Sequence, residues 1–312
     1  MSTLSAKVTI VGAGFVGSTA ALRCAQKDIA EVVLIDVAGG VARGKALDMR
    51  QMRAIDQFGS YVTGTDDYAD TAGSDIVVIT AGIARKPGML REELVAINGG
   101  VVSEVIERAR EASPGALFMC VTNPLDVMTY LAQKKSGIAP ERLFGMGGVL
   151  DSARFVASIA AELEAPLAEV DGLVIGAHGE GMVPLVDEAR VAGRPLRESA
   201  TPAQVEAIIG HTVGGGAEIV NFLQTGSAYF APGAAIAHMV EACLTGSDEL
   251  MSVCAYLDGP YGQHDLYMNV PVRLGRAGVR EIVELDISAA ERAALDASGA
   301  SVVTLLTEAG LR

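Results

Sequence analysis

Short apolar runs alternate with helical patterns over the first 145 residues. Residues 7–11 form a β-branched run that breaks at Gly12, and residues 14–26 carry the Ala and Leu residues typical of a helix. Further apolar runs occupy residues 31–35, 76–80 and 117–121. Buried parallel strands have this near-continuous apolar character, because helices cover both faces of their sheet. The alternation predicts right-handed βαβ units and an α/β fold with a doubly wound parallel sheet.

The pattern changes after a glycine-rich stretch at residues 145–148. Beyond it we expect a helix, two strands and a terminal helix, over residues 149–163, 251–257, 266–272 and 288–311. The mixture predicts a second domain of α+β type. We therefore expect one domain over residues 1–147 and a second, mixed α+β domain over residues 148–312.

Two helix starts and one joint stand out in the second half. Thr201 is followed by Gln204 three residues later, and Ser288 is followed by Glu291 at the same spacing. A hydroxyl residue followed three positions later by Glu or Gln is the order of a capping box, so a helix should begin at each place. The three consecutive glycines at 214–216 are expected to form a joint between two elements.

Charge and composition narrow the classes of function. The formal net charge is −14, and the 24 Lys and Arg residues are scattered along the chain. A nucleic-acid surface needs clustered cations, so we expect no nucleic-acid partner. With 50% hydrophobic and only 4% aromatic residues, the composition suits aliphatic strands between helices better than an aromatic-rich β-sandwich.

Cysteine and histidine usage favours a reducing compartment and no metal site. The four cysteines show no C-x-x-C spacing and lie in apolar surroundings, at Cys24, Cys120, Cys243 and Cys254. We expect them to be free, buried thiols. The spacing expected of metal ligands is missing from His211, His238 and His264. Since no apolar stretch reaches about 18 residues and no signal-peptide pattern is present, we expect a cytoplasmic protein without a membrane partner.

The segment from Gly12 to Gly17 has the pattern G-x-G-x-x-G, between a predicted strand and a predicted helix. Gly12 permits a tight turn, Gly14 lets a pyrophosphate approach the backbone at the helix N-terminus, and Gly17 allows close helix–strand packing. Asp36 ends the next strand, where a carboxylate accepts hydrogen bonds from ribose hydroxyls and repels a 2′-phosphate. This context predicts a Rossmann dinucleotide site that prefers NAD to NADP.

Two segments follow the ends of predicted strands, where open α/β sheets place ligand groups. The loop at residues 81–91 holds Arg85 and Arg91 among turn-forming residues, and Asn123 lies just beyond another strand. Each also has a plainer interpretation. The loop would then be an ordinary solvated loop, and Asn123 would be a helix cap.

Two further candidates lie in the second half. Asp151 and Arg154 are three residues apart, on one face of a predicted helix. His178 lies between small residues after an apolar strand. Taken alone, the first pair is as consistent with an intrahelical ion pair, and His178 with a buried structural residue.

Taken together, these segments resemble the lactate and malate dehydrogenase superfamily, and within it the malate dehydrogenases of lactate-dehydrogenase-like type. The resemblance covers nearly the whole chain, from Lys7 to the C-terminal helix. Its segments occur in the family's order: the glycine pattern, the loop with Arg85 and Arg91, V-T-N-P, L-D-S-A-R-F, G-A-H-G and T-G-S-A-Y-F-A-P.

The resemblance implies hydride transfer between (S)-malate and NAD, with oxaloacetate and NADH as products. It makes His178 the general acid and base, oriented by Asp151. It makes Arg154 the residue that binds the substrate carboxylate, with the loop residues Arg85 and Arg91 completing the substrate site. Chemistry agrees, because an alcohol oxidised by hydride loss needs a base for its proton and a cation beside its oxygen.

Three further residues are expected to complete the cofactor and substrate site. Asn123 is expected to hold the nicotinamide or the substrate oxygen, and Asn98 and Val121 complete the cofactor site. The family also implies a homotetramer or a homodimer, and no sequence feature chooses between them.

Two alternatives stay open. A lactate dehydrogenase of the same fold would have Gln at the position of Arg85 and a substrate with one carboxylate. A non-catalytic NAD-binding protein could share the fold, because fold alone does not determine function.

Overall fold

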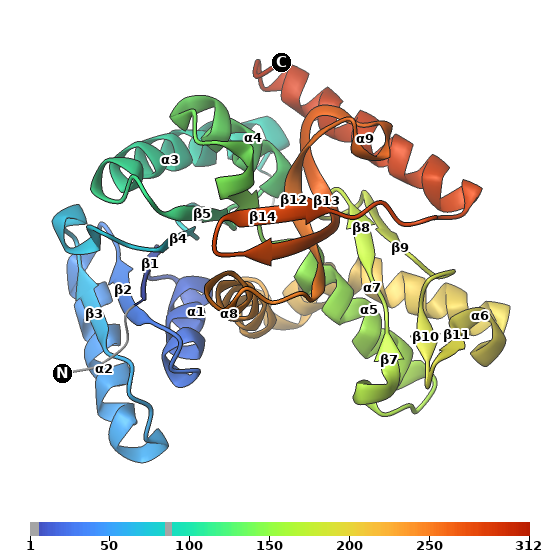
Figure 1. The fold of residues 1–312 in the computed structure, drawn as a ribbon, viewed down its shortest axis with the longest axis horizontal. Coiled ribbons are helices and arrows are strands. Elements are labelled where there is room, and N and C mark those ends of the chain that lie inside the picture. Colours follow the sequence, from blue (N-terminus) through green and yellow to red (C-terminus); the bar gives the residue numbers. More distant parts are fainter. Residues whose placement is uncertain (1–5, 85–88) are drawn as a thin grey trace.

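The structure is a computed structural model that describes residues 6–84 and 89–312. Strands and helices alternate through the first half (Figure 1). In chain order these are β1 (Lys7–Val11), α1 (Phe15–Gln26), β2 (Glu31–Ile35), α2 (Gly39–Asp56), β3 (Val62–Thr65), β4 (Ile76–Ile79), α3 (Arg91–Ala112), β5 (Leu117–Cys120), α4 (Leu125–Ser136) and β6 (Leu143–Gly145). The predicted alternation is confirmed, and each of the four strands predicted in this half lies within one residue of the observed one, whereas β3 and β6 were not predicted.

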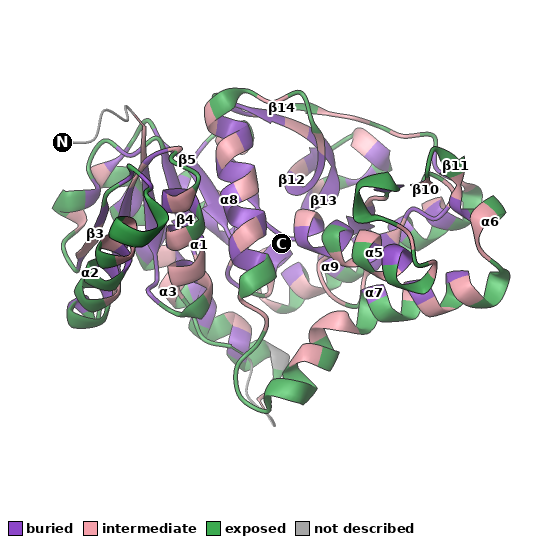
Figure 2. Ribbon diagram, turned by 90° about the horizontal axis from the view of Figure 1, so that it is seen from below, coloured by how far each residue is buried: buried purple, intermediate pink, exposed green. Residues whose placement is uncertain are grey.

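The six strands of the first half form a parallel sheet in the order β3-β2-β1-β4-β5-β6. The strand order reverses between β1 and β4, whose carboxyl ends lie side by side. Ligands of doubly wound sheets bind in the crevice at such a switch point. In Figure 2 these strands are mostly purple, whereas much of α2 is green, so the sheet is the buried layer and α2 faces solvent.

The second half adds antiparallel strands and longer helices. Its elements are α5 (Gly148–Glu162), β7 (Val170–Asp171), β8 (Val174–Gly176), β9 (Met182–Pro184), β10 (Arg190–Val191), β11 (Arg194–Pro195), α6 (Leu196–Ser199), α7 (Pro202–Leu223), α8 (Phe230–Thr245), β12 (Leu250–Asp258), β13 (His264–Gly275), β14 (Gly278–Ile282) and α9 (Ala289–Glu308). Short 3-10 helices cover Tyr68–Thr71, Pro140–Arg142, Leu167–Glu169 and Pro260–Gly262. The expected mixed α/β second half is confirmed.

One sheet runs through both halves. β6 of the parallel sheet pairs with β12 through Gly145 and Cys254, and the order continues β12-β13-β8-β9, with β14 on β13. The predicted boundary at residue 147 therefore falls between β6 and α5, beside a strand pair that joins the two halves. The division into domains 1–147 and 148–312 stays a prediction.

Helix α8 also connects the halves, because it returns from the second half to pack against α1 (Figure 1). Gly233 of α8 lies so close to α1 that a Cβ atom there would be 2.6 Å from Cγ2 of Thr19 and 3.0 Å from the Ala20 nitrogen. Buried side chains of α8 belong to the same apolar core as β1 and β4. The first half is thus completed by a helix from the second.

The glycines at 214–216 do not form a joint, and that expectation is wrong. They lie inside α7, which is capped by Thr201 as predicted and runs unbroken from Pro202 to Leu223. A glycine inside a helix costs roughly 0.5–1 kcal/mol relative to alanine, which tertiary packing can offset. Here α7 packs on α5, and a Cβ at Gly216 would lie 3.6 Å from the guanidinium of Arg154. That distance is an ordinary van der Waals contact, so the packing of α7 on α5 keeps the helix continuous without requiring glycine at this point.

Replacement of Gly233 by alanine should lower the free energy of unfolding by about 1–3 kcal/mol, because the new methyl group would overlap α1. The matched control is Gly100→Ala in α3, where a Cβ would have no neighbour within 4 Å. That change should raise stability by about 0.5–1 kcal/mol. Urea denaturation of the three proteins measures both effects. Equal stability of Gly233→Ala and the parent would contradict the close α1–α8 packing.

Candidate active site

His178 lies in a loop that follows β8 and directly faces the first turn of α5. Its Nδ1 is 2.7 Å from Oδ2 of Asp151. Asp151 is fully buried, whereas the His178 side chain keeps 17% of its surface exposed. Burial lowers the pKa of His178, but the charge and hydrogen bond of Asp151 outweigh it, with help from Asp126, so the pKa lies above its usual value. Since Asp151 occupies Nδ1, the other ring nitrogen is left for a ligand.

Arg154 shares the same carboxylate. Its Nη1 lies 3.1 Å from Oδ1 of Asp151, and its side chain is 18% exposed. The rest of the guanidinium makes no hydrogen bond within the described part of the chain. A planar guanidinium with free N–H groups can bind a carboxylate through two parallel hydrogen bonds. The predicted ion pair of Asp151 with Arg154 exists, and it includes His178 as a third member.

The glycine turn after β1 has the geometry that the sequence pattern predicts. Gly12 has φ +107°, and a Cβ there would lie 2.9 Å from the Ala81 nitrogen. A Cβ at Gly17 would lie 1.9 Å from the carbonyl oxygen of Gly12. A Cβ at Gly14 would meet nothing within 4 Å, and Gly14 caps the N-terminus of α1. The open backbone at Gly14 suits an approaching pyrophosphate.

Asp36 joins the end of β2 to the glycine turn. Its Oδ2 accepts from the Ala13 nitrogen at 2.6 Å, and its Oδ1 accepts from the Ala38 nitrogen at 2.8 Å. Each carboxylate oxygen has a further lone pair for a ribose hydroxyl. Lys45 also reaches this turn, since its Nζ donates to the Ala13 carbonyl at 2.6 Å. Lys45 was not among the predicted residues, because no local pattern marks a lysine of α2 that contacts a turn 32 residues earlier.

The expected amide residues of the site differ in their surroundings. Asn98 is fully buried, and its side chain bonds both backbone groups of Ile83 and the carbonyl of Asn123. Asn98 thereby holds the start of the loop against the segment after β5. The exposed Asn123 side chain has no hydrogen-bond partner among the described residues and is free to bind a ligand. Val121 is half-buried, and its nitrogen donates to Ile79 at 2.9 Å.

The two loop arginines are placed only in part. Arg85 lies outside the described residues. Arg91 is the first residue of α3, and the structure describes its backbone but not its side chain. The loop leaves the sheet at Ala81, where the Thr122 hydroxyl donates to the Ala81 carbonyl at 2.7 Å. The expected roles of both arginines stay predictions.

The four cysteines are free and buried, as expected. Burial raises the pKa of Cys24 and of Cys243 to about 12.

Over residues 6–84 and 89–312, no group of His, Cys, Asp and Glu side chains is arranged to hold a metal ion. Within the same ranges, every helix is too short or too polar to cross a membrane.

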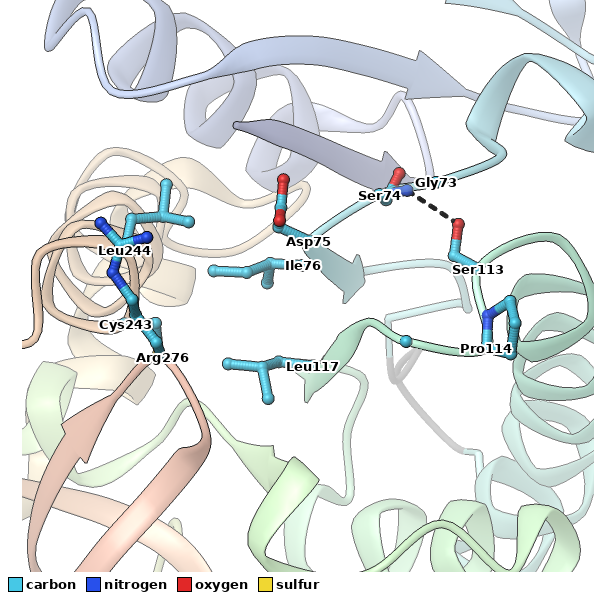
Figure 3. Close-up of a pocket in the computed structure, with 11 residues that line it drawn as sticks. Gly73, Ser74, Asp75, Ile76, Ser113, Pro114, Leu117, Cys243, Leu244 and Arg276 are labelled. Carbon is cyan, nitrogen blue, oxygen red and sulfur yellow. Dashed lines mark hydrogen bonds between the residues drawn. The ribbon is translucent and has the colours of Figure 1, made fainter. Parts of the chain in front are cut away.

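A cavity of about 450 Å³ lies at the amino ends of the parallel strands, whereas the glycine turn lies at their carboxyl ends. Figure 3 shows Cys243 and Arg276 on one side of it and Ser113 on the other. Its floor includes Ile76 and Leu117, the first residues of β4 and β5. Because doubly wound sheets bind ligands at the carboxyl ends of their strands, this cavity is not the dinucleotide site. His178 lines a separate cavity of about 420 Å³ between α4 and α9.

Comparison with known families agrees with this geometry. Residues 6–145 match the family model described as lactate/malate dehydrogenase, NAD binding domain. Residues 148–309 match the model of the alpha/beta C-terminal domain of the same family. The chain belongs to the lactate/malate dehydrogenase family. The resemblance seen in the sequence, the fold class and the NAD cofactor are thereby confirmed.

Individual members of the lactate/malate dehydrogenase family are similar over almost their full length. The chain is 50% identical over 296 residues to a malate dehydrogenase of Nostoc punctiforme, with 95% of this chain and 90% of the relative covered. The structure of malate dehydrogenase from Salinibacter ruber has a TM-score of 0.90 at 43% identity, over 97% of this chain and 99% of that one.

A solved lactate dehydrogenase is equally similar in fold. The Cryptosporidium parvum enzyme, in complex with lactic acid and nicotinamide adenine dinucleotide, has a TM-score of 0.94 at 38% identity, with 98% of each chain covered. Both activities therefore occur on this backbone.

The two glycines of the turn should respond differently to alanine. Gly17→Ala should lower both stability and NADH affinity, because its methyl group would overlap the Gly12 carbonyl. Gly14→Ala should leave stability unchanged but weaken NADH binding by roughly tenfold, about 1.4 kcal/mol, because its methyl group would occupy the pyrophosphate approach. NADH fluorescence titration and thermal unfolding separate the two. Normal NADH binding by a folded Gly14→Ala protein would refute this role.

Proposed function

We propose that the protein is an NAD-dependent malate dehydrogenase, which interconverts (S)-malate and oxaloacetate. The observation that carries the proposal is the triad of Asp151, His178 and Arg154 in a chain whose glycine turn and Asp36 fit NAD. When bound, NAD accepts the hydride from the carbinol carbon of malate and returns it to oxaloacetate in the reverse reaction. A protein that only binds NAD would not need this triad.

His178 is the general base in malate oxidation. Its Nε2 takes the hydroxyl proton, and the imidazolium that forms is stabilised by Asp151 at Nδ1. In the reverse direction the protonated ring donates this proton to the oxaloacetate carbonyl. The raised pKa of His178 supports that direction, because it increases the fraction of enzyme that holds the proton near neutral pH.

Arg154 binds the carboxylate next to the reacting carbon. Its contact with Asp151 orients the guanidinium and leaves N–H groups for the substrate. In this proposal Arg91 stabilises the developing alkoxide and Arg85 binds the second carboxylate of malate. Asn123 holds the substrate oxygen or the nicotinamide, and its unpaired amide supports that role.

The choice of malate over lactate depends on Arg85. The scaffold does not decide it, because a malate and a lactate dehydrogenase have TM-scores of 0.90 and 0.94 against this chain. A guanidinium buried without a counter-charge costs several kcal/mol. Oxaloacetate supplies a carboxylate at that position, whereas pyruvate supplies a methyl group.

The location we propose is the cytoplasm, which the four free thiols support.

The specificity constant for oxaloacetate should exceed that for pyruvate by at least on the order of 10³, because pyruvate leaves Arg85 without a partner. Arg85→Gln should reverse much of this preference, because glutamine needs no counter-charge. The measurement is NADH oxidation with each 2-oxo acid, for both proteins, at saturating NADH.

His178→Asn is the control for the chemistry itself. It should lower turnover by a factor on the order of 10²–10⁴ with either substrate and leave NADH binding intact. A wild-type enzyme that reduces pyruvate as well as oxaloacetate would reject the substrate assignment, as would a Gln variant that keeps the full preference. Normal turnover in His178→Asn would reject the catalytic assignment.

We propose further that the protein assembles as a homodimer or homotetramer. The C-terminal part of α7 exposes Val220, Phe222 and Leu223, with Phe222 80% exposed. Large apolar side chains gathered on one helix are typical of contacts between subunits. Sedimentation equilibrium should give the mass of two or four chains, and Phe222→Asp should shift it toward one chain. A wild-type protein that sediments as a single chain at micromolar concentration would contradict the proposal.

A further inference from the structure

The loop that carries His178 is held by side chains from distant elements. Ser298 of α9 accepts from the Ala177 nitrogen at 2.8 Å and donates to the Gly181 carbonyl at 2.7 Å. Asp126 of α4 accepts from the backbone nitrogen of His178 itself at 3.1 Å. The loop backbone is therefore fixed on both sides of the imidazole.

Asp126 is the charged member of this set. Its side chain is almost completely buried, and its other oxygen, Oδ1, faces the Cys254 thiol at 3.5 Å. A backbone N–H needs only one neutral acceptor, and a buried charge is costly unless another charge compensates it. Burial raises the pKa of Asp126 to about 6, although the charge of His178 opposes that rise. When His178 is protonated, its imidazolium therefore supplies the charge that compensates ionised Asp126.

Three charged groups from two elements face the imidazole. Asp151 and Arg154 come from α5, on the Nδ1 side, and Asp126 comes from α4. Glu180, from the loop itself, lines the same cavity as His178 and Asp126. The residues of α9 that line this cavity, such as Ala297 and Ser298, are uncharged. Glu180 is exposed, so among the described residues that line this cavity Asp126 is the buried carboxylate that contacts His178.

We propose that Asp126 is a positioning residue for the proposed reaction: it holds the His178 peptide through its N–H and stabilises the protonated imidazole as a second carboxylate. Asp151 fixes the tautomer and the ring, whereas Asp126 fixes the backbone and adds negative charge. The two functions of Asp126 are separable, because an asparagine amide oxygen still accepts the N–H but carries no charge.

The sign of the pH effect follows from this arrangement. Above pH 6, the approximate pKa of Asp126, its carboxylate is charged and favours the protonated form of His178. Removing the charge lowers the pKa of His178. Reduction of oxaloacetate needs protonated His178, so its rate should decline at a lower pH in the variant. Oxidation of malate needs neutral His178, so its rate should begin to rise at a lower pH.

The test compares pH profiles of kcat/KM for oxaloacetate at saturating NADH. Asp126→Asn should move the midpoint of the decline down by about 0.5–1 pH unit, and Asp151→Asn should move it further. The matched control is Asp265→Asn, which removes a carboxylate bonded to Tyr130 and Tyr256 and outside the site. It should leave the midpoint unchanged. An unchanged midpoint in a folded, active Asp126→Asn enzyme would overturn the proposal, whatever its rate.

A second measurement covers the case in which Asp126→Asn does not fold. The chain has four histidines, so the Cε1 resonance of His178 can be assigned in the wild type by its loss in His178→Asn. Coupling to Asp126 should give its titration a second inflection near pH 6. A single inflection would overturn the proposal. This titration does not depend on turnover, so it tests the role of Asp126 even in an enzyme that does not reduce oxaloacetate. Failure to reduce oxaloacetate would reject the proposed function and leave the role of Asp126 to be decided by the titration.

Discussion

The buried carboxylate of Asp151 is the group on which the arrangement of the site depends. One oxygen meets Nδ1 of His178 at 2.7 Å and the other meets Nη1 of Arg154 at 3.1 Å. A buried carboxylate is tolerated when both oxygens have charged or hydrogen-bonding partners, and it holds those partners in return. A single side chain therefore sets the distance between the group that would move a proton and the group that would bind the substrate carboxylate.

The position of Asp151 depends in turn on the sheet that joins the two halves. Asn269 of β13 accepts from the Gly148 nitrogen at 2.6 Å and donates to the Gly176 carbonyl at 2.9 Å. Gly148 begins the helix of Asp151, and Gly176 ends the strand before His178. This buried amide bridges the backbones of the two elements and so helps to set the relative position of the Asp151 carboxylate and the His178 imidazole. The continuity of the sheet is thus a condition for the contact between Asp151 and His178.

Local patterns predicted what local interactions determine. Four of the six strands of the first half (β1, β2, β4 and β5), the glycine turn and the helix starts at Thr201 and Ser288 were predicted, because apolar periodicity, chain turns and capping act over a few residues. The glycines of α7 were misjudged, since a run of glycines is locally typical of a break, whereas packing on the distant helix α5 keeps α7 continuous. Asn269 was not found at all for the same reason. Its partners are 121 and 93 residues distant, and no short motif records such a contact.

Reaction type and substrate choice have different structural origins under the proposed function. The proposed acid–base pair is supported by side chains of α4, β13 and α9, which hold the backbone around His178. Both malate and lactate dehydrogenases share this backbone, since both align over nearly the whole chain. Hydride transfer next to a carboxylate makes the same demands for either substrate. Discrimination must then come from side chains that meet the far end of the substrate, and a surface loop can change these without disturbing the core.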